Sequence, residues 1–146
     1  MYQIAALLYP RALATSITLP LEIVRAAAQI AQVRSRLAPG VSHALAAADL
    51  QPVSLFGGLT LTPDLHYNDL PPLDLLIIPA IWRNPATVIK GARPWLGQLA
   101  KIAASGTRVC AVGTGTFLLA EAGLLDGKPA TTHWNYLCLL YTSDAA

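Results

Sequence analysis

Apolar and polar positions along the chain divide it into short apolar runs and longer segments with helical spacing. The apolar runs have the length of buried strands and lie at Tyr2–Tyr9, Ser42–Ala48, Leu73–Pro79 and Thr107–Val112. The segments with helical character lie at Ala14–Ser35, Ala92–Ser105 and Thr114–Ala122. Strands that alternate with helices predict an α/β fold with a mostly parallel sheet and right-handed crossovers.

Two of these segments carry further detail. In the first helix, apolar residues recur at three-to-four spacing and form one stripe, the pattern of an amphipathic helix: Leu19, Ile23, Ala26, Ile30 and Val33. Between the second and third runs, Val53–Thr62 contains Gly57-Gly58 and an alternating tail, which predicts either a short hairpin or an excursion at the edge of the sheet.

The most informative stretch is Thr107–Trp134, which reads as a strand, a tight turn and a helix that ends at Gly123. Such a turn directs backbone N–H groups toward one point and favours an anion there. A nucleophile elbow has the pattern small-x-nucleophile-x-small. The best register here is Ala111–Gly115, so the nucleophile position is Gly113, which has no side chain.

Composition narrows the class of protein. The chain has 146 residues, 54% of them hydrophobic and 12% charged, with a net charge of +2. One domain is expected, and the charge is too small to indicate direct nucleic-acid binding. We see no signal peptide and no span long enough for a bilayer, so we expect a cytoplasmic protein without membrane contact. Cys110 and Cys138 lack metal-ligand spacing, and we expect no disulfide, metal or cofactor.

The run VGTGTFLLAEAGLLDGKPATTHW, at 112–134, resembles the core of the ThiJ/PfpI family in the class I glutamine amidotransferase-like superfamily. More narrowly, it resembles the sensory N-terminal domain of GlxA-type transcriptional regulators of the AraC family. LPLEIV at 19–24 and DLLIIP at 74–79 extend the resemblance, which covers about residues 2–137. It implies a flavodoxin-like three-layer sandwich, a pocket at the strand tips and a homodimer.

The resemblance also assigns residues. The family's elbow position, usually a cysteine, falls on Gly113, its helix-borne acid on Glu22 and its histidine on His133. The glycine pair often found after the middle strand is here Ala80-Ile81. We therefore expect no catalytic residue, and we expect a pocket for a small polar or anionic metabolite formed by Glu22, Ala80, Ile81, Trp82, Gly113, Thr114 and His133.

The end of the chain departs from the family pattern. The tail at 138–146, CLLYTSDAA, resembles translated adapter sequence rather than the expected helix and further strands. We therefore expect the domain to occupy 1–137 and the sandwich to be incomplete at its C-terminus. DNA would be contacted only through a helix-turn-helix module that is missing from this chain.

Three functions remain open at this point. The first is a non-catalytic ligand sensor of a transcriptional regulator, and the third is an interaction domain with an inert pocket. The second is a stand-alone hydrolase, amidase or glyoxalase-like enzyme, which needs a nucleophile. Thr114 fits the elbow register poorly, and Cys110 is expected to be a buried, unreactive core residue of its strand.

Overall fold

Five parallel strands form the main sheet, in the spatial order β5-β2-β1-β6-β7. In this computed structural model, which describes residues 1–141, the strands are β1 (Tyr2–Leu7), β2 (Val41–Ala47), β5 (Leu65–His66), β6 (Leu75–Ile78) and β7 (Arg108–Ala111). The two short strands β3 (Val53–Ser54) and β4 (Thr60–Leu61) pair antiparallel as a separate hairpin. The predicted hairpin and the predicted α/β class with a parallel sheet are both confirmed.

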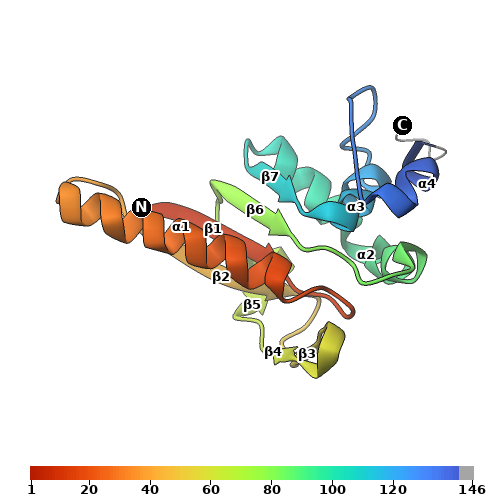
Figure 1. Ribbon diagram of the computed structural model, residues 1–146, viewed down its shortest axis with the longest axis horizontal. Helices are drawn as coiled ribbons and strands as arrows, with labels where there is room; N and C mark the ends of the chain where they lie inside the picture. Colours follow the sequence, from red (N-terminus) through yellow and green to blue (C-terminus); the bar gives the residue numbers. More distant parts are fainter. Residues whose placement is uncertain (142–146) are drawn as a thin grey trace.

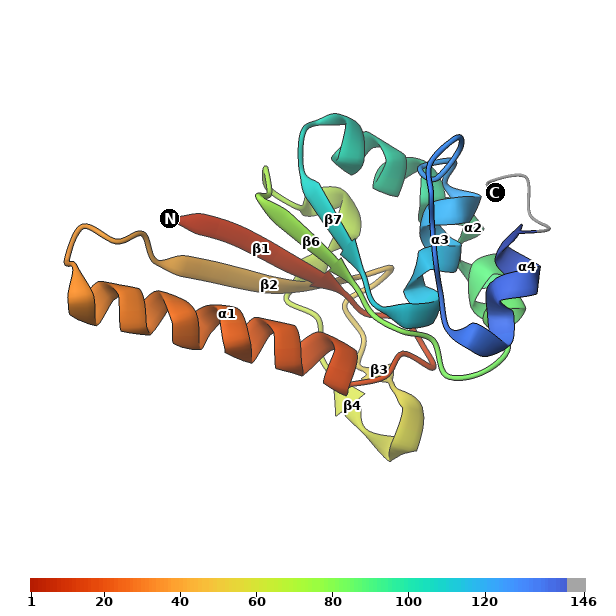
Figure 2. The ribbon, with the colours of Figure 1, turned by 45° about the horizontal axis from the view of Figure 1, so that its top comes forward.

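Helices lie on both faces of the sheet and produce three layers (Figure 1). Helix α1 (Thr15–Arg34) runs along one face, and α2 (Pro85–Ala104) lies on the other with α3 (Thr116–Glu121) packed beside it. A last helix, α4 (Leu137–Tyr141), follows the loop after α3, as Figure 2 shows. Within residues 1–141, no helix combines the length and apolar character needed to cross a membrane.

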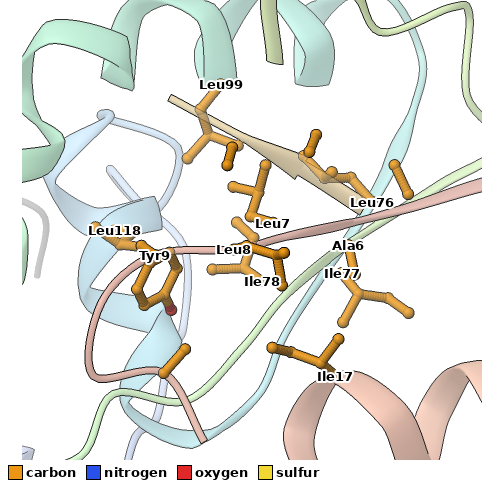
Figure 3. Close-up of a cluster of buried hydrophobic side chains, with 14 of the residues drawn as sticks. Ala6, Leu7, Leu8, Tyr9, Ile17, Leu76, Ile77, Ile78, Leu99 and Leu118 are labelled. Atoms are coloured by element: carbon orange, nitrogen blue, oxygen red, sulfur yellow. The ribbon is translucent and has the colours of Figure 1, made fainter. Parts of the chain in front are cut away.

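The core forms where the two helical layers meet the central strands. Figure 3 shows Ile17 of α1 and Leu99 of α2 reaching the sheet from opposite faces. Because both faces of β1 and β6 are covered there, these strands are almost continuously apolar, as expected for central parallel strands. Ile77 and Ile78 illustrate this arrangement: they are adjacent in β6, they point to opposite faces, and both are buried.

The second long helix begins earlier than the sequence pattern predicts. It starts at Pro85, where the missing N–H and the fixed φ of proline suit the first helical turn. Pro94, expected in the first turn of a helix from Ala92, lies inside the helix instead. The predicted C-terminal stop is confirmed, because Gly106 follows the helix with a φ of +94°.

The apolar stripe of α1 faces away from the sheet. Its four large members, Leu19, Ile23, Ile30 and Val33, are between 55% and 88% exposed. The residues of α1 that are buried are Ser16, Ile17 and Leu21. The helix is thus apolar on two sides, and three-to-four spacing by itself does not distinguish the side that meets the sheet.

Cys110 is exposed, and its predicted burial in the strand is wrong. It belongs to β7, an edge strand of the sheet, and pairs in register with Ile77 of β6. Helix α1 packs mainly against β2, which lies three places away from β7 in the sheet. A groove of about 510 Å³ beside α1, lined by Ile4, Leu75 and Arg108 among others, leaves this part of the sheet open.

The C-terminal segment lies partly outside the described residues. Leu137–Tyr141 forms α4, in which Cys138 is exposed and Leu140 is buried. Residues 142–146 of the expected off-pattern tail lie outside the described part of the chain.

Candidate functional site

The loops that follow β6 and β7 meet at the carboxyl edge of the sheet. The N–H of Val112 donates to the carbonyl of Ile78 at 2.9 Å and extends the pairing of the two strands to their ends. A β-carbon placed on Gly113 would lie 3.7 Å from that of Ala80. Ligands of open α/β sheets bind at this edge, so the two loops define the candidate site.

The loop after β7 has the geometry of a strained turn. Gly113 has a φ of +50°, a conformation that side chains other than glycine rarely adopt. Gly115 packs directly on the end of β6, where a β-carbon would lie 2.6 Å from the carbonyl oxygen of Pro79. Gly115, one of the two small flanking residues of the predicted elbow register, is therefore required at this turn, and glycine also stands at the position of the nucleophile.

Thr114 is buried and uses its hydroxyl within the protein. The hydroxyl accepts a hydrogen bond from the N–H of Ile81 at 2.8 Å and donates to the carbonyl of the same residue at 2.9 Å. A hydroxyl that is paired in both directions holds the two loops together. It is not positioned to attack a substrate.

Ser16, which the sequence analysis did not select, is the residue of α1 that contacts this site. Its hydroxyl donates to the carbonyl of Leu13 at 2.6 Å and accepts the N–H of Ala80 at 2.9 Å. Ser16 is buried in the first turn of α1. The only sequence signal for it is its position at the beginning of a helix that follows a strand, where serine commonly serves as a cap.

Tyr9, which follows β1, also supports the end of β6. Its hydroxyl donates to the carbonyl of Pro79, the same oxygen that Gly115 approaches. Burial raises the pKa of the Tyr9 phenol well above its ordinary value, because the charged form is desolvated. The neutral phenol is therefore the donor over the ordinary pH range.

The structure brings four of the seven predicted site residues together: Ala80, Ile81, Gly113 and Thr114. His133 follows Thr132, whose hydroxyl donates to the carbonyl of Gly113 at 3.1 Å, but its own ring lies against Trp134 and Tyr136. The His133 Nδ1 atom accepts the N–H of Asn135 and caps the short helix that follows.

The remaining two predicted residues lie away from these contacts. Glu22 is exposed, and within residues 1–141 its carboxylate forms no hydrogen bond or ion pair. Trp82 stacks on Phe56 with ring centroids 4.0 Å apart, and Arg83 lies over the Trp82 ring. The side chain of Trp82 therefore belongs to the hairpin side of the molecule.

The backbone supplies the free polar groups of the site. Among residues 1–141, the N–H groups of Gly113 and Thr114 have no hydrogen-bond partner, and Gly113 is exposed. Two adjacent N–H groups of a turn can hold an anionic oxygen. In the described part of the chain, no cluster of three or more histidine, cysteine or acidic side chains is placed to bind a metal ion.

A separate cavity of about 600 Å³ lies at the carboxyl ends of β1 and β2, beside α2. It is lined by apolar side chains such as Leu8, Val88 and Trp95, together with Arg11 and Asp49. None of the seven predicted site residues lines it. The elbow residues Gly113 and Thr114 thus lie outside this cavity.

Comparison with known proteins places this geometry in context. A family model described as the DJ-1/PfpI family matches residues 17–145. The isonitrile hydratase of Pseudomonas putida is 33% identical over 144 residues, which cover 98% of this chain and 57% of that protein. The HTH-type transcriptional regulator CdhR of Pseudomonas aeruginosa is 36% identical over 87 residues, which cover 60% of this chain and 25% of the regulator.

Solved structures share the same architecture. An AraC family transcriptional regulator from Pseudomonas putida superposes with a TM-score of 0.72 at 22% identity, and the match covers 96% of this chain and 71% of that one. This likeness concerns the fold. The chain spans 57% or less of the length of the two curated relatives named above.

Proposed function

The chain belongs to the DJ-1/PfpI family, and from this premise we propose that it is a ligand-sensing, non-catalytic domain of a GlxA-type transcriptional regulator. The observation that carries the proposal is the turn at Gly113. Its φ of +50° and the close packing of Gly115 reproduce an elbow, yet the residue at the nucleophile position has no side chain. A covalent mechanism requires an activated nucleophile at that point.

The proposed ligand is a small polar or anionic metabolite held by the elbow. The unpartnered N–H groups of Gly113 and Thr114 would bind a carboxylate or phosphate oxygen. Ala80 would form the opposite wall, and His133 would reach the ligand from the segment that Thr132 ties to Gly113. Glu22 and Trp82 lie away from the elbow in this structure, and in the proposal they contact the ligand only if they move toward it when it binds.

The rest of the regulator is part of the same proposal. DNA would be bound through a helix-turn-helix module outside this chain, in a cytoplasmic protein that acts as a homodimer. The similarity to CdhR supports this assignment, and the AraC family structure supports the fold on which it rests.

An enzyme is the second candidate function, because the isonitrile hydratase similarity extends over 98% of this chain. The exposure of Cys110 removes the objection that its thiol is inaccessible. Cys110 nevertheless precedes the elbow by three residues and points to the sheet face that Ile77 shares. A nucleophile there would act outside the site that the two loops form.

Calorimetry can test the ligand site with inorganic phosphate, phosphate esters and short-chain carboxylates as probes. Gly113→Ala places a methyl group at the elbow and should weaken binding of a positive probe at least tenfold. Gly127→Ala is the matched control, since Gly127 is also exposed with a positive φ of +69°. Equal binding by both variants, or no heat with any probe, would contradict the proposed site.

Turnover separates the two candidate functions. The chain should not hydrate an isonitrile or convert methylglyoxal. Turnover that Cys110→Ala abolishes, with an unchanged circular dichroism spectrum, would favour the enzyme instead.

A further inference from the structure

The cavity at the carboxyl ends of β1 and β2 is separate from the elbow and has no role in the proposed function. Its volume of about 600 Å³ lies within the range of about 300–1,000 Å³ that is usual for small-molecule sites. Protein interiors are otherwise closely packed, with few voids larger than a water molecule. A void of this size at the strand ends of an open α/β sheet is therefore a candidate for a second ligand site.

Helix α2 forms one wall of this cavity and leaves space in it through a glycine. Val88, Gly91 and Trp95 line the cavity at spacings of three and four residues, so they share one face of the helix. Nothing lies within 4 Å of a β-carbon placed on Gly91. Val88 and Trp95 are buried, and the Trp95 ring stacks on that of Tyr9, which also lines the cavity, with centroids 6.4 Å apart. These walls suit an acyl chain or an aromatic ring.

Arg11 brings an unpaired positive charge to the same cavity. It is half-buried, and among residues 1–141 its guanidinium forms no hydrogen bond or ion pair. Its φ of +72° is a left-handed conformation, which costs strain for a residue that has a side chain. Its carbonyl accepts the N–H of Trp82 at 2.8 Å and so fixes the backbone of this loop. The fold thus holds a free cation beside apolar walls.

We propose that this cavity binds a monocarboxylic acid with an apolar chain or ring, its carboxylate on Arg11 and its apolar part against Val88 and Trp95. The planar guanidinium matches a carboxylate and can donate two parallel hydrogen bonds to it. Asp49 also lines the cavity; it is exposed, and one of its oxygens accepts the N–H of Gln51 at 2.8 Å. Because Asp49 adds a negative charge to the lining, a monoanion fits better than a phosphate dianion.

This second site goes beyond the proposed function, because no residue of the predicted elbow site lines the cavity. An anion at the elbow would depend on the backbone of Gly113 and Thr114, whereas an acid in the cavity depends on the Arg11 side chain. The two sites can therefore succeed or fail separately.

Calorimetric titration of the 146-residue chain with phenylacetate and hexanoate tests the charge at Arg11. Arg11→Gln should raise the dissociation constant of either acid about tenfold or more, because the charged hydrogen bonds are lost. The matched control is Arg93→Gln, since Arg93 is an exposed arginine of α2 that does not line the cavity. Neutral phenylacetamide should bind wild type and Arg11→Gln equally. No binding of either acid to the wild type, or equal affinities of wild type and Arg11→Gln for it, would overturn the proposal.

A second pair of variants tests the cavity without changing a charge. Gly91→Leu should fill space beside Trp95 and weaken acid binding about tenfold or more. Gly97→Leu is the matched control: both glycines are exposed in α2 with nothing within 4 Å of an added β-carbon, but Gly97 does not line the cavity. Circular dichroism and thermal unfolding check that every variant folds. Unchanged binding by Gly91→Leu, or an equal loss in both leucine variants, would place the acid elsewhere and overturn the site.

Discussion

The hydroxyl of Thr114 forms a two-way hydrogen bond with the backbone of Ile81, accepting from its N–H at 2.8 Å and donating to its carbonyl at 2.9 Å. This pair joins the loop after β7 to the loop after β6, and both loops belong to the candidate site. The elbow is thus held from within the protein. Its buried hydroxyl serves to position the loops, and the N–H groups of Gly113 and Thr114 have no partner among residues 1–141.

Thr114→Val should destabilise the protein by about 1–3 kcal/mol, because the N–H and carbonyl of Ile81 would be buried without partners. Urea denaturation measures the change. Thr114→Ser keeps the hydroxyl and is the control, with a smaller expected loss. Equal stabilities for the valine variant and the wild type would show that the two loops do not depend on this contact.

Gly115→Ala should destabilise the protein by at least about 1–3 kcal/mol, since the added methyl group would overlap backbone oxygen atoms. It would lie 2.6 Å from the oxygen of Pro79 and 2.9 Å from that of Ile78. Gly97→Ala is the control: Gly97 lies inside α2, with nothing within 4 Å of an added β-carbon. That change should stabilise the helix by about 0.5–1 kcal/mol, and thermal unfolding of both variants provides the comparison.

Tyr9→Phe should remove a component of the dependence of stability on alkaline pH. Burial raises the pKa of Tyr9 in the folded state, whereas an unfolded tyrosine ionises near pH 10. The contribution of the neutral phenol to stability is therefore complete below about pH 10 and falls as the pH rises above it.

The measurement is the difference in unfolding free energy between wild type and Tyr9→Phe from about pH 8 to about pH 11. This difference should be about 1 kcal/mol at the lower pH, from the lost hydrogen bond to Pro79. It should shrink as the pH rises. A constant difference would mean that Tyr9 does not ionise as the buried group the structure shows.

Gly113→Cys should create a reactive thiol at the elbow. The new side chain would meet only the β-carbon of Ala80, at 3.7 Å. The free backbone N–H groups and the turn before α3 should stabilise its thiolate and lower its pKa. In a Cys110→Ser, Cys138→Ser background, iodoacetamide should modify it faster than it modifies Cys110 in the wild type. A slower reaction would mean that the N–H groups do not point at position 113.

Local patterns predicted much of the fold because they report what a short segment can bury. The apolar runs at β1, β6 and β7, the hairpin at β3 and β4, and the glycine stops after α2 and α3 follow from strand burial and from positive φ angles. The register of the elbow also follows from sequence, because only glycine fits at Gly115. These features depend on neighbours along the chain.

The site is formed by residues that are distant in sequence, and the local sequence pattern did not predict all of them. Ser16 rather than Glu22 supplies the contact from α1, through a bond to Ala80 that spans 64 positions. Glu22 was selected from a family resemblance, although periodicity alone makes it a solvated charge of the helix, and it is indeed exposed. Trp82 likewise follows the correct strand, but its ring stacks on the distant Phe56.

The sequence by itself determined the alternation of strands and helices, the tight turn at Gly113 and the absence of a side chain at its centre. Tertiary structure alone decided which apolar side of α1 meets the sheet and whether the faces of β7 are covered. The spacing of apolar residues along the sequence identifies an apolar stripe on a helix, but it does not show which surface that stripe packs against. Burial requires a second surface, and the position of that surface is set only when all the layers are assembled.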